Sequence, residues 1–336
     1  MEYRTLGRSD LKVSAIGFGC WEMGGSHYGS TDEAEVTRAV HRAIDLGVTL
    51  FDTAPVYGFG GSEEALGRAL GTRRNEVVLV SKGGQTWDPV TTTRKADARY
   101  SELKRGLEDS LRRLGTDHLD LFLIHWPDPE TPIEESARAL AEMVDEGKTR
   151  YVGVCNHSAY ELREMAKHAP IVTNQVGYNM FDRRWEKEMF PTARELGLNV
   201  MAYGPMAHGL LTGAFRRDQV FEPGDWRRSG VLFGQRLLGP NLAANLDVVD
   251  ELRGLAERIG TTLPRLALAW VLRDPIVAVA LSGCRTVAEV EENVRAVEVT
   301  IPFDVLARVD AALGKVVGRS DVIPARHRTP PALVSA

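Results

Sequence analysis

Residues 32–52, DEAEVTRAVHRAIDLGVTLFD, contain one complete helix-then-strand unit. The apolar residues Val36, Val40 and Ile44 recur at the spacing of one helix face, and the segment opens on an aspartate in a sequence typical of a helix N-terminus. The β-branched and aromatic run Thr49–Asp52 that follows is typical of a short buried strand. This stretch therefore predicts a helix that leads directly into a strand, which is the repeating unit of a parallel α/β fold.

The same alternation recurs along the chain. The predicted strands are Ala15–Phe18, Thr49–Asp52, Val77–Ser81, Leu119–His125, Tyr151–Val154, Ile171–Gln175, Asn199–Tyr203 and Ile276–Leu281. The predicted helices are Asp32–Leu46, Ser62–Leu70, Ala98–Leu114, Ile133–Glu146, Ala159–His168, Trp185–Leu196, Ala244–Ile259 and Thr286–Val297. Eight is the number of strands at which such a sheet closes into a barrel filled by side chains.

The whole chain, residues 1–336, is therefore predicted to be a single α/β domain: a (β/α)8 TIM barrel with an N-terminal β-hairpin and long loops at its C-terminal face. The hairpin is predicted from short apolar alternation in Tyr3–Leu6 and Leu11–Val13. The longest loop, Pro205–Pro240, has a length typical of functional or disordered segments. Residues from about 319 to 336 are predicted to form an extended C-terminal tail.

An open, doubly wound sheet is the alternative fold. Such a sheet carries Gly-x-Gly-x-x-Gly in its first strand-to-helix turn. The corresponding stretch here, Gly17-Phe18-Gly19, lacks the third glycine, and no helix follows at once. The pattern therefore favours the barrel.

Composition excludes several classes of function. The net charge is −5 and the basic residues form no long run, which argues against a nucleic-acid partner. The three cysteines, Cys20, Cys155 and Cys284, are too few and too far apart for a disulfide framework, and they form no CxxC motif. The N-terminus has no apolar signal-peptide core, and no apolar run approaches the ~18 residues of a membrane span. A cytoplasmic, soluble protein with no membrane partner is expected.

Four ionisable residues occur where predicted strands end. Asp52 ends the second strand and Tyr57 lies five residues further on, Lys82 follows the third strand, and His125 ends the fourth. Catalytic groups of (β/α)8 barrels lie at this C-terminal edge, so we expect the four side chains to meet there. No metal site is expected, because no dense set of His, Asp and Glu ligands appears.

The four residue types suit a reaction at an oxygen bound to carbon. A lysine ammonium favours the phenolate form of a nearby tyrosine and so lowers its pKa, while a carboxylate keeps that lysine charged. A histidine can hydrogen-bond a carbonyl oxygen and fix its direction. Together they would protonate or deprotonate the oxygen while another group supplies hydride.

Several long motifs resemble those of the aldo-keto reductase superfamily, over nearly the whole chain from about Tyr3 to Gly314. The similar segments are 47–58 (GVTLFDTAPVYG), Ser62-Glu63, 79–82 (LVSK), 120–128 (DLFLIHWPD), 153–156 (GVCN) and 175–179 (QVGYN). The 125–128 run and residues 209–213 (GLLTG) are most similar to the bacterial general-stress and related oxidoreductase branch. The resemblance implies an NADP(H)-dependent reductase of aldehydes and ketones in which Tyr57 is the general acid or base, Lys82 lowers its pKa, Asp52 pairs with Lys82 and His125 orients the substrate.

The resemblance also implies a cofactor site, with NADP as the expected cofactor and NAD as the second choice. Asn156 and Gln175 are expected to bind the nicotinamide carboxamide, and Tyr203 to stack on the nicotinamide ring. The remaining expected contacts are Gly204, Leu210 and Gly213 over the pyrophosphate, Gly283 at the anion-binding N-terminus of the last helix, Arg285 at the 2′-phosphate, and Asn293 at the adenine. Trp21 and Trp126 are expected to form walls for a small carbonyl or alcohol substrate, with Trp87, Trp226 and Phe233 as rim candidates.

Three residues depart from the family pattern. Cys155 replaces the serine expected before Asn156, which weakens or replaces one contact to the nicotinamide. Glu289 stands where relatives carry Arg or Gln, and a carboxylate repels a 2′-phosphate but can accept a hydrogen bond from a free 2′-hydroxyl. His208 lies in the phosphate-side loop, as a weak cation or a bystander. Preference for NADPH over NADH therefore stays open.

Three other functions remain as alternatives. One is a cofactor-binding regulatory or scaffold protein on the same barrel, which would not need Tyr57 or Lys82. Another is an NAD-dependent sugar or alcohol dehydrogenase, and a third is a barrel isomerase or lyase. The presence of all four catalytic residue types favours the reductase, while the oligomeric state is left open.

Overall fold

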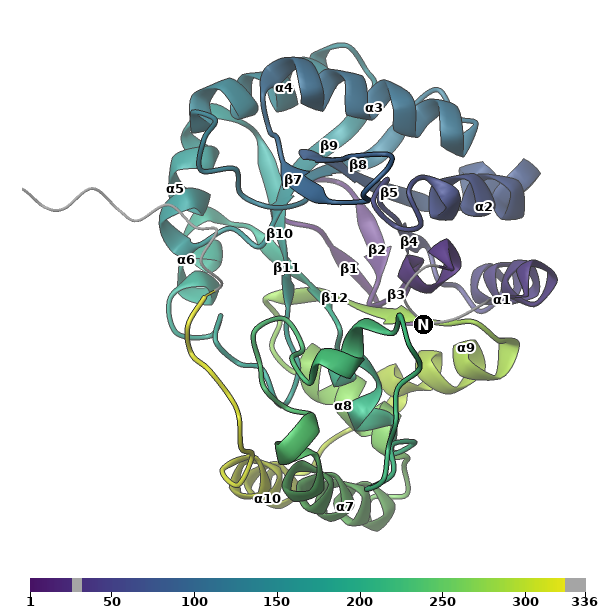
Figure 1. The fold of residues 1–336 in the computed structure, drawn as a ribbon, viewed down its shortest axis with the longest axis vertical. Helices are drawn as coiled ribbons and strands as arrows, with labels where there is room; N and C mark the ends of the chain where they lie inside the picture. Colours follow the sequence, from purple (N-terminus) through teal and green to yellow (C-terminus); the bar gives the residue numbers. More distant parts are fainter. Residues whose placement is uncertain (26–31, 324–336) are drawn as a thin grey trace, which may run out of the picture.

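A closed barrel of eight parallel strands forms the centre of the molecule (Figure 1). The computed structural model describes residues 1–25 and 32–323. Around the barrel the strand order is β10-β11-β12-β3-β4-β5-β8-β9. The strands are β3 (Ile16–Gly19), β4 (Leu50–Asp52), β5 (Val78–Gly83), β8 (Leu119–Ile124), β9 (Thr149–Cys155), β10 (Ile171–Gly177), β11 (Asn199–Tyr203) and β12 (Val277–Gly283). The predicted (β/α)8 fold is confirmed, and each barrel strand lies within two residues of a predicted one.

Helices surround the barrel (Figure 1). They are α1 (Glu33–Asp45), α2 (Gly61–Leu70), α3 (Tyr100–Leu114), α4 (Ile133–Asp145), α5 (Ala159–His168), α6 (Met189–Leu196), α7 (Leu242–Arg258), α8 (Leu263–Leu272), α9 (Val287–Val294) and α10 (Phe303–Leu313). The Asp32 side chain accepts hydrogen bonds from the backbone N–H groups of Ala34 and Glu35, which confirms the predicted start of α1. The helix predicted from Trp185 begins only at Met189, because turns precede it.

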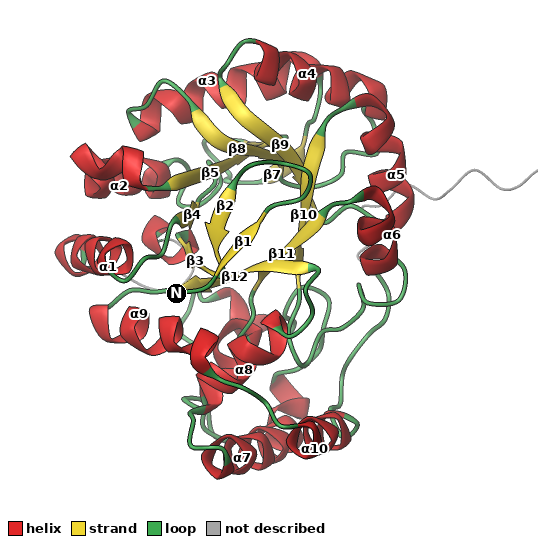
Figure 2. Cartoon of the chain, turned by 180° about the vertical axis from the view of Figure 1, so that it is seen from behind, coloured by secondary structure: helices red, strands yellow, loops and turns green. Residues whose placement is uncertain are grey.

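The helix between β11 and β12 differs from the prediction. The predicted segment Ala244–Ile259 forms α7, which packs against α10 outside the ring; the two helices lie side by side in both views (Figures 1 and 2). The helix that packs against β12 is α8, which the sequence analysis did not identify. Its sequence, LPRLALAWVL, is apolar on almost every face and almost wholly buried, so it lacks the periodicity of a half-exposed helix. The amphipathic helix α10 was also not predicted.

The N-terminal hairpin fills one end of the barrel. Strands β1 (Tyr3–Thr5) and β2 (Lys12–Ser14) pair antiparallel, as predicted, and lie across the barrel end that faces the viewer in Figure 2. Leu6, Leu11 and Val13 belong to the same buried cluster as the inward-facing side chains of the barrel strands. The hairpin therefore closes the barrel end opposite the strand C-termini, and the other end remains for chemistry.

Long connections cover that other end. A second hairpin, β6 (Gln85–Trp87) with β7 (Arg94–Ala96), follows β5 and lies over the barrel mouth in Figure 1. The predicted long loop contains the short 3-10 helices η3 (Ala207–Thr212) and η4 (Trp226–Ser229). Backbone and side-chain hydrogen bonds join Gln235 and Arg236 of this loop to residues 318–320, so the start of the predicted tail packs on the loop. The tail beyond residue 323 lies outside the described residues. No helix among residues 1–25 and 32–323 is long and apolar enough to cross a membrane.

Candidate active site

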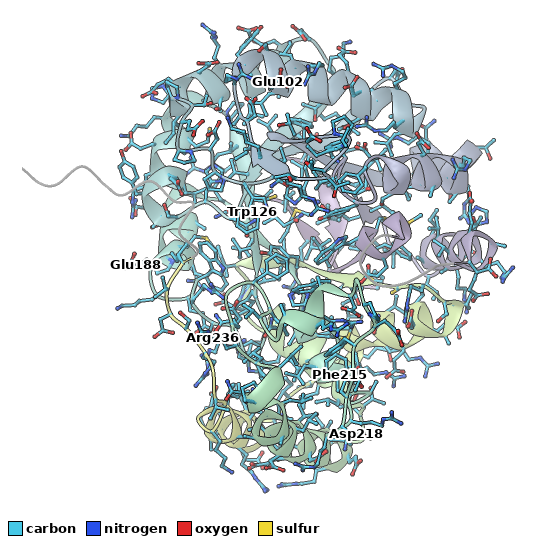
Figure 3. All side chains as sticks on the ribbon, viewed as in Figure 1. Glu102, Trp126, Glu188, Phe215, Asp218 and Arg236 are labelled. Carbon is cyan, nitrogen blue, oxygen red and sulfur yellow. The ribbon has the colours of Figure 1, made fainter. Side chains whose placement is uncertain are left out.

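A cavity of about 1120 Å³ opens at the C-terminal ends of the barrel strands. Side chains fill the rest of this face, with Trp126 near its centre (Figure 3). The predicted site residues that line the cavity are Trp21, Asp52, Tyr57, His125, Trp126, Asn156, Gln175, Tyr203, Gly204, Gly283, Arg285, Glu289 and Asn293. Segments from every part of the chain thus meet in one elongated site.

Lys82 is the centre of the buried polar network at the cavity floor. Its ammonium lies 2.6 Å from Asp52 Oδ2 and donates to the backbone carbonyl of Thr53 at 2.8 Å and to the Tyr57 hydroxyl at 3.4 Å. Gln175 Nε2 donates to Asp52 Oδ1 at 2.7 Å, so both carboxylate oxygens of Asp52 are bonded. The fold therefore brings Asp52, Tyr57 and Lys82 together, as predicted. Lys82 is fully buried beneath the cavity wall.

Burial and charge oppose each other in this network. Burial raises the pKa of the Tyr57 hydroxyl above its usual value, and the Lys82 ammonium only partly offsets that rise. Burial acts to lower the pKa of Lys82, but the charges of Asp52 and Tyr57 raise it above its usual value on balance. Lys82 thus stays charged and Tyr57 keeps its proton at neutral pH. Lys82 therefore lowers the pKa of Tyr57, as expected, but burial has the larger effect and leaves that pKa above its usual value.

His125 is held neutral next to Tyr57. Burial, with smaller contributions from the charges of Lys82 and Arg94, keeps its pKa well below the ordinary value. Its ring lies edge-on to Tyr57 with centroids 5.7 Å apart, and its Nδ1 has no hydrogen-bond partner among the described residues. A neutral imidazole at this position can hydrogen-bond a substrate oxygen without adding charge.

The first turn of α2 fixes the strand ends that carry these groups. Ser62 Oγ donates to the backbone carbonyl of Cys20 at 2.7 Å and lies 2.9 Å from the Thr53 hydroxyl. The fully buried Glu63 accepts from Ser81 Oγ at 2.5 Å and from Arg113 Nε at 2.6 Å. Since Thr53 and Ser81 adjoin the catalytic positions, this buried pair of residues orients the site without touching the cavity.

Two amides and a tyrosine ring form the middle of the cavity. Tyr203 donates its hydroxyl hydrogen to Asn156 Oδ1 at 2.9 Å, and Asn156 Nδ2 donates to the backbone carbonyl of His125 at 3.3 Å. Asn156 has a positive φ of 58°, a conformation that asparagine tolerates better than most residues. Cys155, the departure before it, is fully buried in the barrel interior and does not line the cavity.

The loop after β11 places different residues in the cavity from those predicted. Gly204 lines it, but Leu210 is fully buried in the core, and Gly213 lies outside the lining beside the Arg253 guanidinium. Gly209 and Thr212 face the cavity instead. Leu210 lies in the predicted loop, but a short 3-10 helix turns its side chain inward, away from the cavity.

The far end of the cavity lies at the start of α9. Thr286 and Glu289 form a capping box, in which the Glu289 carboxylate accepts from the backbone N–H groups of Arg285 at 2.7 Å and Thr286 at 3.2 Å. The same carboxylate lies 4.0 Å from the Arg285 guanidinium. Asn293 is buried and donates to Ser282 Oγ at 2.8 Å. This end therefore offers one guanidinium, already close to a carboxylate.

Aromatic rings form the wall next to Tyr57. Trp21 stacks on Tyr57 with centroids 5.9 Å apart and on Trp226 at 5.4 Å, and Phe233 lies parallel to Trp126 at 6.5 Å. Phe233 lines the cavity, in agreement with its expected rim role, whereas Trp226 packs behind Trp21 and is not in the lining. Trp87 packs on Phe59 instead and is not in the cavity lining.

His208 belongs to this aromatic wall and is not a cation. It stacks on Phe233 with centroids 5.0 Å apart and meets Trp226 edge-on at 5.1 Å. Burial, with the nearby charge of Arg227, lowers its pKa to about 3. His208 was expected to be either a weak cation or a bystander, and a neutral ring packed in the wall agrees with the second role.

Sequence reasoning missed four charged residues that line the cavity: Glu22, Arg94, Arg227 and Glu292. Glu22 had a detectable signal, because it lies three residues after the first barrel strand, at the face where functional groups gather. Arg94 comes from the β6–β7 hairpin and Arg227 from η4, and neither position has a local pattern that separates it from a solvated arginine.

Such a site defines a class of protein. A closed parallel barrel whose mouth holds a buried lysine–aspartate pair against a tyrosine hydroxyl is typical of a barrel oxidoreductase. Residues 15–313 match the model of the Aldo/keto reductase family. The chain belongs to the aldo/keto reductase family, as its motifs indicated.

Three relatives show how far the similarity extends. The chain is 37% identical over 294 residues to the aldo-keto reductase YhdN of Bacillus subtilis, covering 87% of each chain. It is 33% identical to the NADH-specific methylglyoxal reductase of Escherichia coli, covering 90% of this chain and 95% of the relative. The solved structure of a glycerol dehydrogenase from Gluconobacter oxydans superposes with a TM-score of 0.86 at 35% identity, covering 96% of this chain and 98% of that one.

Proposed function

We propose that this protein reduces small aldehydes or ketones to alcohols, or runs the reverse reaction, with a nicotinamide dinucleotide as hydride carrier. The observation that carries the proposal is the contact of the buried, charged Lys82 with the Tyr57 hydroxyl beside the neutral His125. Charge neutralisation by Asp52 lets this ammonium persist without water. A binding-only protein on the same fold would not need a proton donor prepared in this way.

The residues along the cavity fit such a cofactor. The amides of Asn156 and Gln175 would hold a carboxamide, because their existing bonds use only part of their donor and acceptor capacity. The ring of Tyr203 would lie against the nicotinamide, and the start of α9 would hold the adenosine end. When bound, the dinucleotide supplies the hydride that the protein's own side chains lack.

The side chains then handle the proton. Tyr57 donates its hydroxyl proton to the carbonyl oxygen of the substrate, and the Lys82 ammonium stabilises the phenolate that remains. His125 fixes the direction of the same oxygen. In alcohol oxidation the phenolate accepts the proton instead. The wall formed by Trp21, Trp126 and Phe233 excludes water from this step and selects for small substrates.

For the cofactor, we propose that NADH is preferred, whereas the motifs alone favour NADPH. Glu289 already takes the backbone N–H groups that a 2′-phosphate would use at the start of α9, and it lies beside Arg285. Glu292 also lines this end of the cavity but is paired with Arg265. A 2′-phosphate would be repelled by the Glu289 carboxylate, whereas a 2′-hydroxyl can donate a hydrogen bond to it.

A cytoplasmic location is part of the same proposal. Cys20, Cys155 and Cys284 are free and buried, as in proteins of reducing compartments.

Replacement of Tyr57 by Phe tests the chemistry. Tyr57→Phe keeps the ring that stacks on Trp21 but removes the proton donor, so turnover of a panel of small aldehydes should fall by roughly 10²–10⁴-fold. Binding of NADH, followed by its fluorescence, should stay within about twofold of the parent protein. Full activity of the variant would exclude the proposed mechanism.

Replacement of Glu289 by Gln tests the cofactor choice. Glutamine preserves the capping box, so only the charge changes. NADPH should then bind roughly tenfold more tightly, while NADH binding changes little. Glu291→Gln is the matched control, because Glu291 pairs with Arg42 outside the cavity. An unchanged ratio of NADPH to NADH affinity would show that Glu289 does not set the preference.

A further inference from the structure

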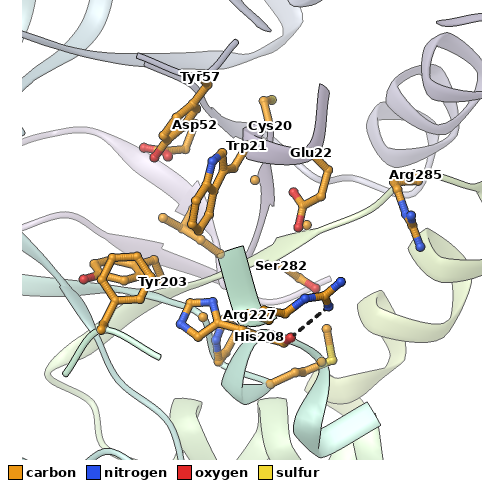
Figure 4. Close-up of a pocket in the computed structure, with 18 of the residues that line it drawn as sticks. Cys20, Trp21, Glu22, Asp52, Tyr57, Tyr203, His208, Arg227, Ser282 and Arg285 are labelled. Atoms are coloured by element: carbon orange, nitrogen blue, oxygen red, sulfur yellow. Dashed lines mark hydrogen bonds between the residues drawn. The ribbon is translucent and has the colours of Figure 1, made fainter. Parts of the chain in front are cut away.

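Glu22 places a carboxylate in the middle of the cavity. It lies on the short 3-10 helix η1 (Trp21–Gly24) that follows β3, and its oxygens approach the backbone of Gly283 so closely that an added Cβ there would lie 2.1 Å from Oε1. Any side chain at position 283 would therefore require the Glu22 carboxylate to move. In Figure 4 the carboxylate points into the space between the Asp52–Tyr57 group and Arg285, above Ser282. Nothing in the proposed reaction uses this acid.

The groups around Glu22 come from three parts of the chain. Arg227 approaches from η4, Arg285 and Glu289 from the start of α9, and the neutral thiols Cys20 and Cys284 from the strand ends. Burial raises the pKa of Glu22 to about 7, a rise that Arg285 and Arg227 offset only in part and that Glu289 reinforces. Burial also raises the pKa of Cys284, to about 12, and that of Cys20, so both thiols stay neutral near pH 7.

A dinucleotide that binds along the cavity must place its charged diphosphate next to Glu22. The diphosphate joins the nicotinamide and adenosine halves, so its place is midway between Tyr203 and Arg285. Glu22, Arg227 and the Ser282-Gly283 backbone line that part of the cavity. The guanidinium groups suit a diphosphate, although Arg227 is paired with Asp225 at 2.6 Å and Arg285 lies 4.0 Å from Glu289, whereas the Glu22 carboxylate in the same place repels it.

We propose that Glu22 competes with the cofactor's diphosphate for the anion position facing Arg227 and Arg285, so that binding of the dinucleotide requires the Glu22 carboxylate to take up a proton. This rests on the proposed function only in that a diphosphate-bearing ligand enters the cavity. Glu22 thus links cofactor affinity to pH. Release of that proton accompanies release of the ligand.

The sign of the linkage follows from the free and bound states. Free Glu22 titrates near pH 7, and two adjacent phosphate charges raise its pKa further in the complex. The complex therefore holds a proton that the free protein loses as the pH rises above about 7. Affinity is greatest below that pH and falls above it, by at most about tenfold per pH unit for one proton.

Calorimetric titration with ADP-ribose measures this directly. ADP-ribose carries the diphosphate but neither the nicotinamide nor a 2′-phosphate, whose own titration near pH 6 would confuse the result. Titration at pH 8 in two buffers of different ionisation enthalpy gives the number of protons bound with the ligand. The parent protein should take up close to one proton, and Glu22→Gln and Glu22→Ala should take up close to none.

Affinities across pH give the second readout. Between pH 6 and 9 the dissociation constant of the parent should rise by roughly tenfold or more, while that of Glu22→Gln stays flat and is roughly tenfold lower than the parent's at pH 8. Glu292→Gln is the control: Glu292 also lines the cavity but pairs with Arg265, so this variant should keep the parent's proton uptake.

The results separate this proposal from the proposed function. Equal proton uptake in the parent and both Glu22 variants, or no binding of ADP-ribose by any of them, overturns the role of Glu22 whether or not carbonyl reduction is observed. Proton-linked binding that disappears in the Glu22 variants supports the role, even if every aldehyde and ketone proves inert and the proposed reaction is wrong.

Discussion

At the scale of single residues, the site depends on a charge that has no access to solvent. The Lys82 ammonium is fully buried, and such an ion persists only where its hydrogen bonds and its charge are matched. The ammonium donates one hydrogen bond to Asp52 and one to the Thr53 carbonyl, so its third N–H is available for the Tyr57 hydroxyl. The burial that isolates this network also raises the pKa of the Tyr57 hydroxyl above its usual value.

The raised pKa of Tyr57 predicts opposite pH dependences for the two reaction directions. Reduction needs the protonated hydroxyl, so its kcat at saturating cofactor should be flat through neutral pH and fall only above about pH 10, the ordinary phenol pKa. Oxidation needs the phenolate, so its kcat should increase with pH from neutral pH to about pH 10, by up to about tenfold per pH unit. Initial rates measured in both directions check this. A fall in the reduction rate between pH 7 and 9 would contradict it.

At the scale of elements, the long loop after β11 forms a fixed wall through Arg184. This buried side chain pairs with Asp182 at 2.8 Å and donates to the backbone carbonyls of Phe233 at 2.9 Å and Val322 at 3.0 Å. One guanidinium therefore joins the loop that carries the cavity wall to the chain segment that follows α10. Loop residues far apart in sequence acquire a defined position in this way.

Loss of Arg184 should loosen the wall and destabilise the fold. Arg184→Ala leaves the buried Asp182 without its counter-charge, so urea unfolding should show a loss of about 3–5 kcal/mol, and the KM for aldehydes should rise because Phe233 is no longer held. Arg194→Ala is the control, since the Arg194–Asp274 pair is more exposed and should contribute less than about 1 kcal/mol. Equal losses in the two variants would refute the role assigned to Arg184.

At the scale of the whole molecule, stability and chemistry are located at opposite ends of the barrel. The β1–β2 hairpin adds Leu6, Leu11 and Val13 to the interior cluster at one end, while the catalytic network lies at the strand C-termini. Inward-facing barrel residues such as Leu121 and Val279 fill the interior between the two ends with apolar side chains and so separate them. Changes at the closed end should therefore alter unfolding without changing the site.

A substitution in the hairpin tests this division. Leu6 is fully buried, so Leu6→Ala should reduce the free energy of unfolding by about 2–5 kcal/mol, measured in urea, with kcat and KM of the folded enzyme unchanged. Tyr3→Ala is the control, because Tyr3 is half exposed and donates one hydrogen bond to Gly47, which predicts a loss below about 1.5 kcal/mol. A large change in kcat for Leu6→Ala would show that the two ends are coupled.

The sequence by itself determined the barrel and most of the catalytic group. Strands and half-exposed helices are recognisable because their periodicity is local, as in residues 32–52, and parallel strands bring their C-terminal residues to one edge, which places Asp52, Lys82 and His125 together. The same reasoning fails for α8, because a helix buried on all sides has no polar face to mark its period.

Only the tertiary structure decided what depends on distance and burial. The meeting of Glu22 with Arg227 and Arg285 joins segments more than 200 residues apart, which no local pattern records. The inward orientation of Leu210 and the raised pKa of Tyr57 also depend on burial in the folded chain, so no local pattern predicts them. A residue's type predicts the sign of each interaction, but desolvation and packing are properties of the folded chain, and they decide which interaction is stronger.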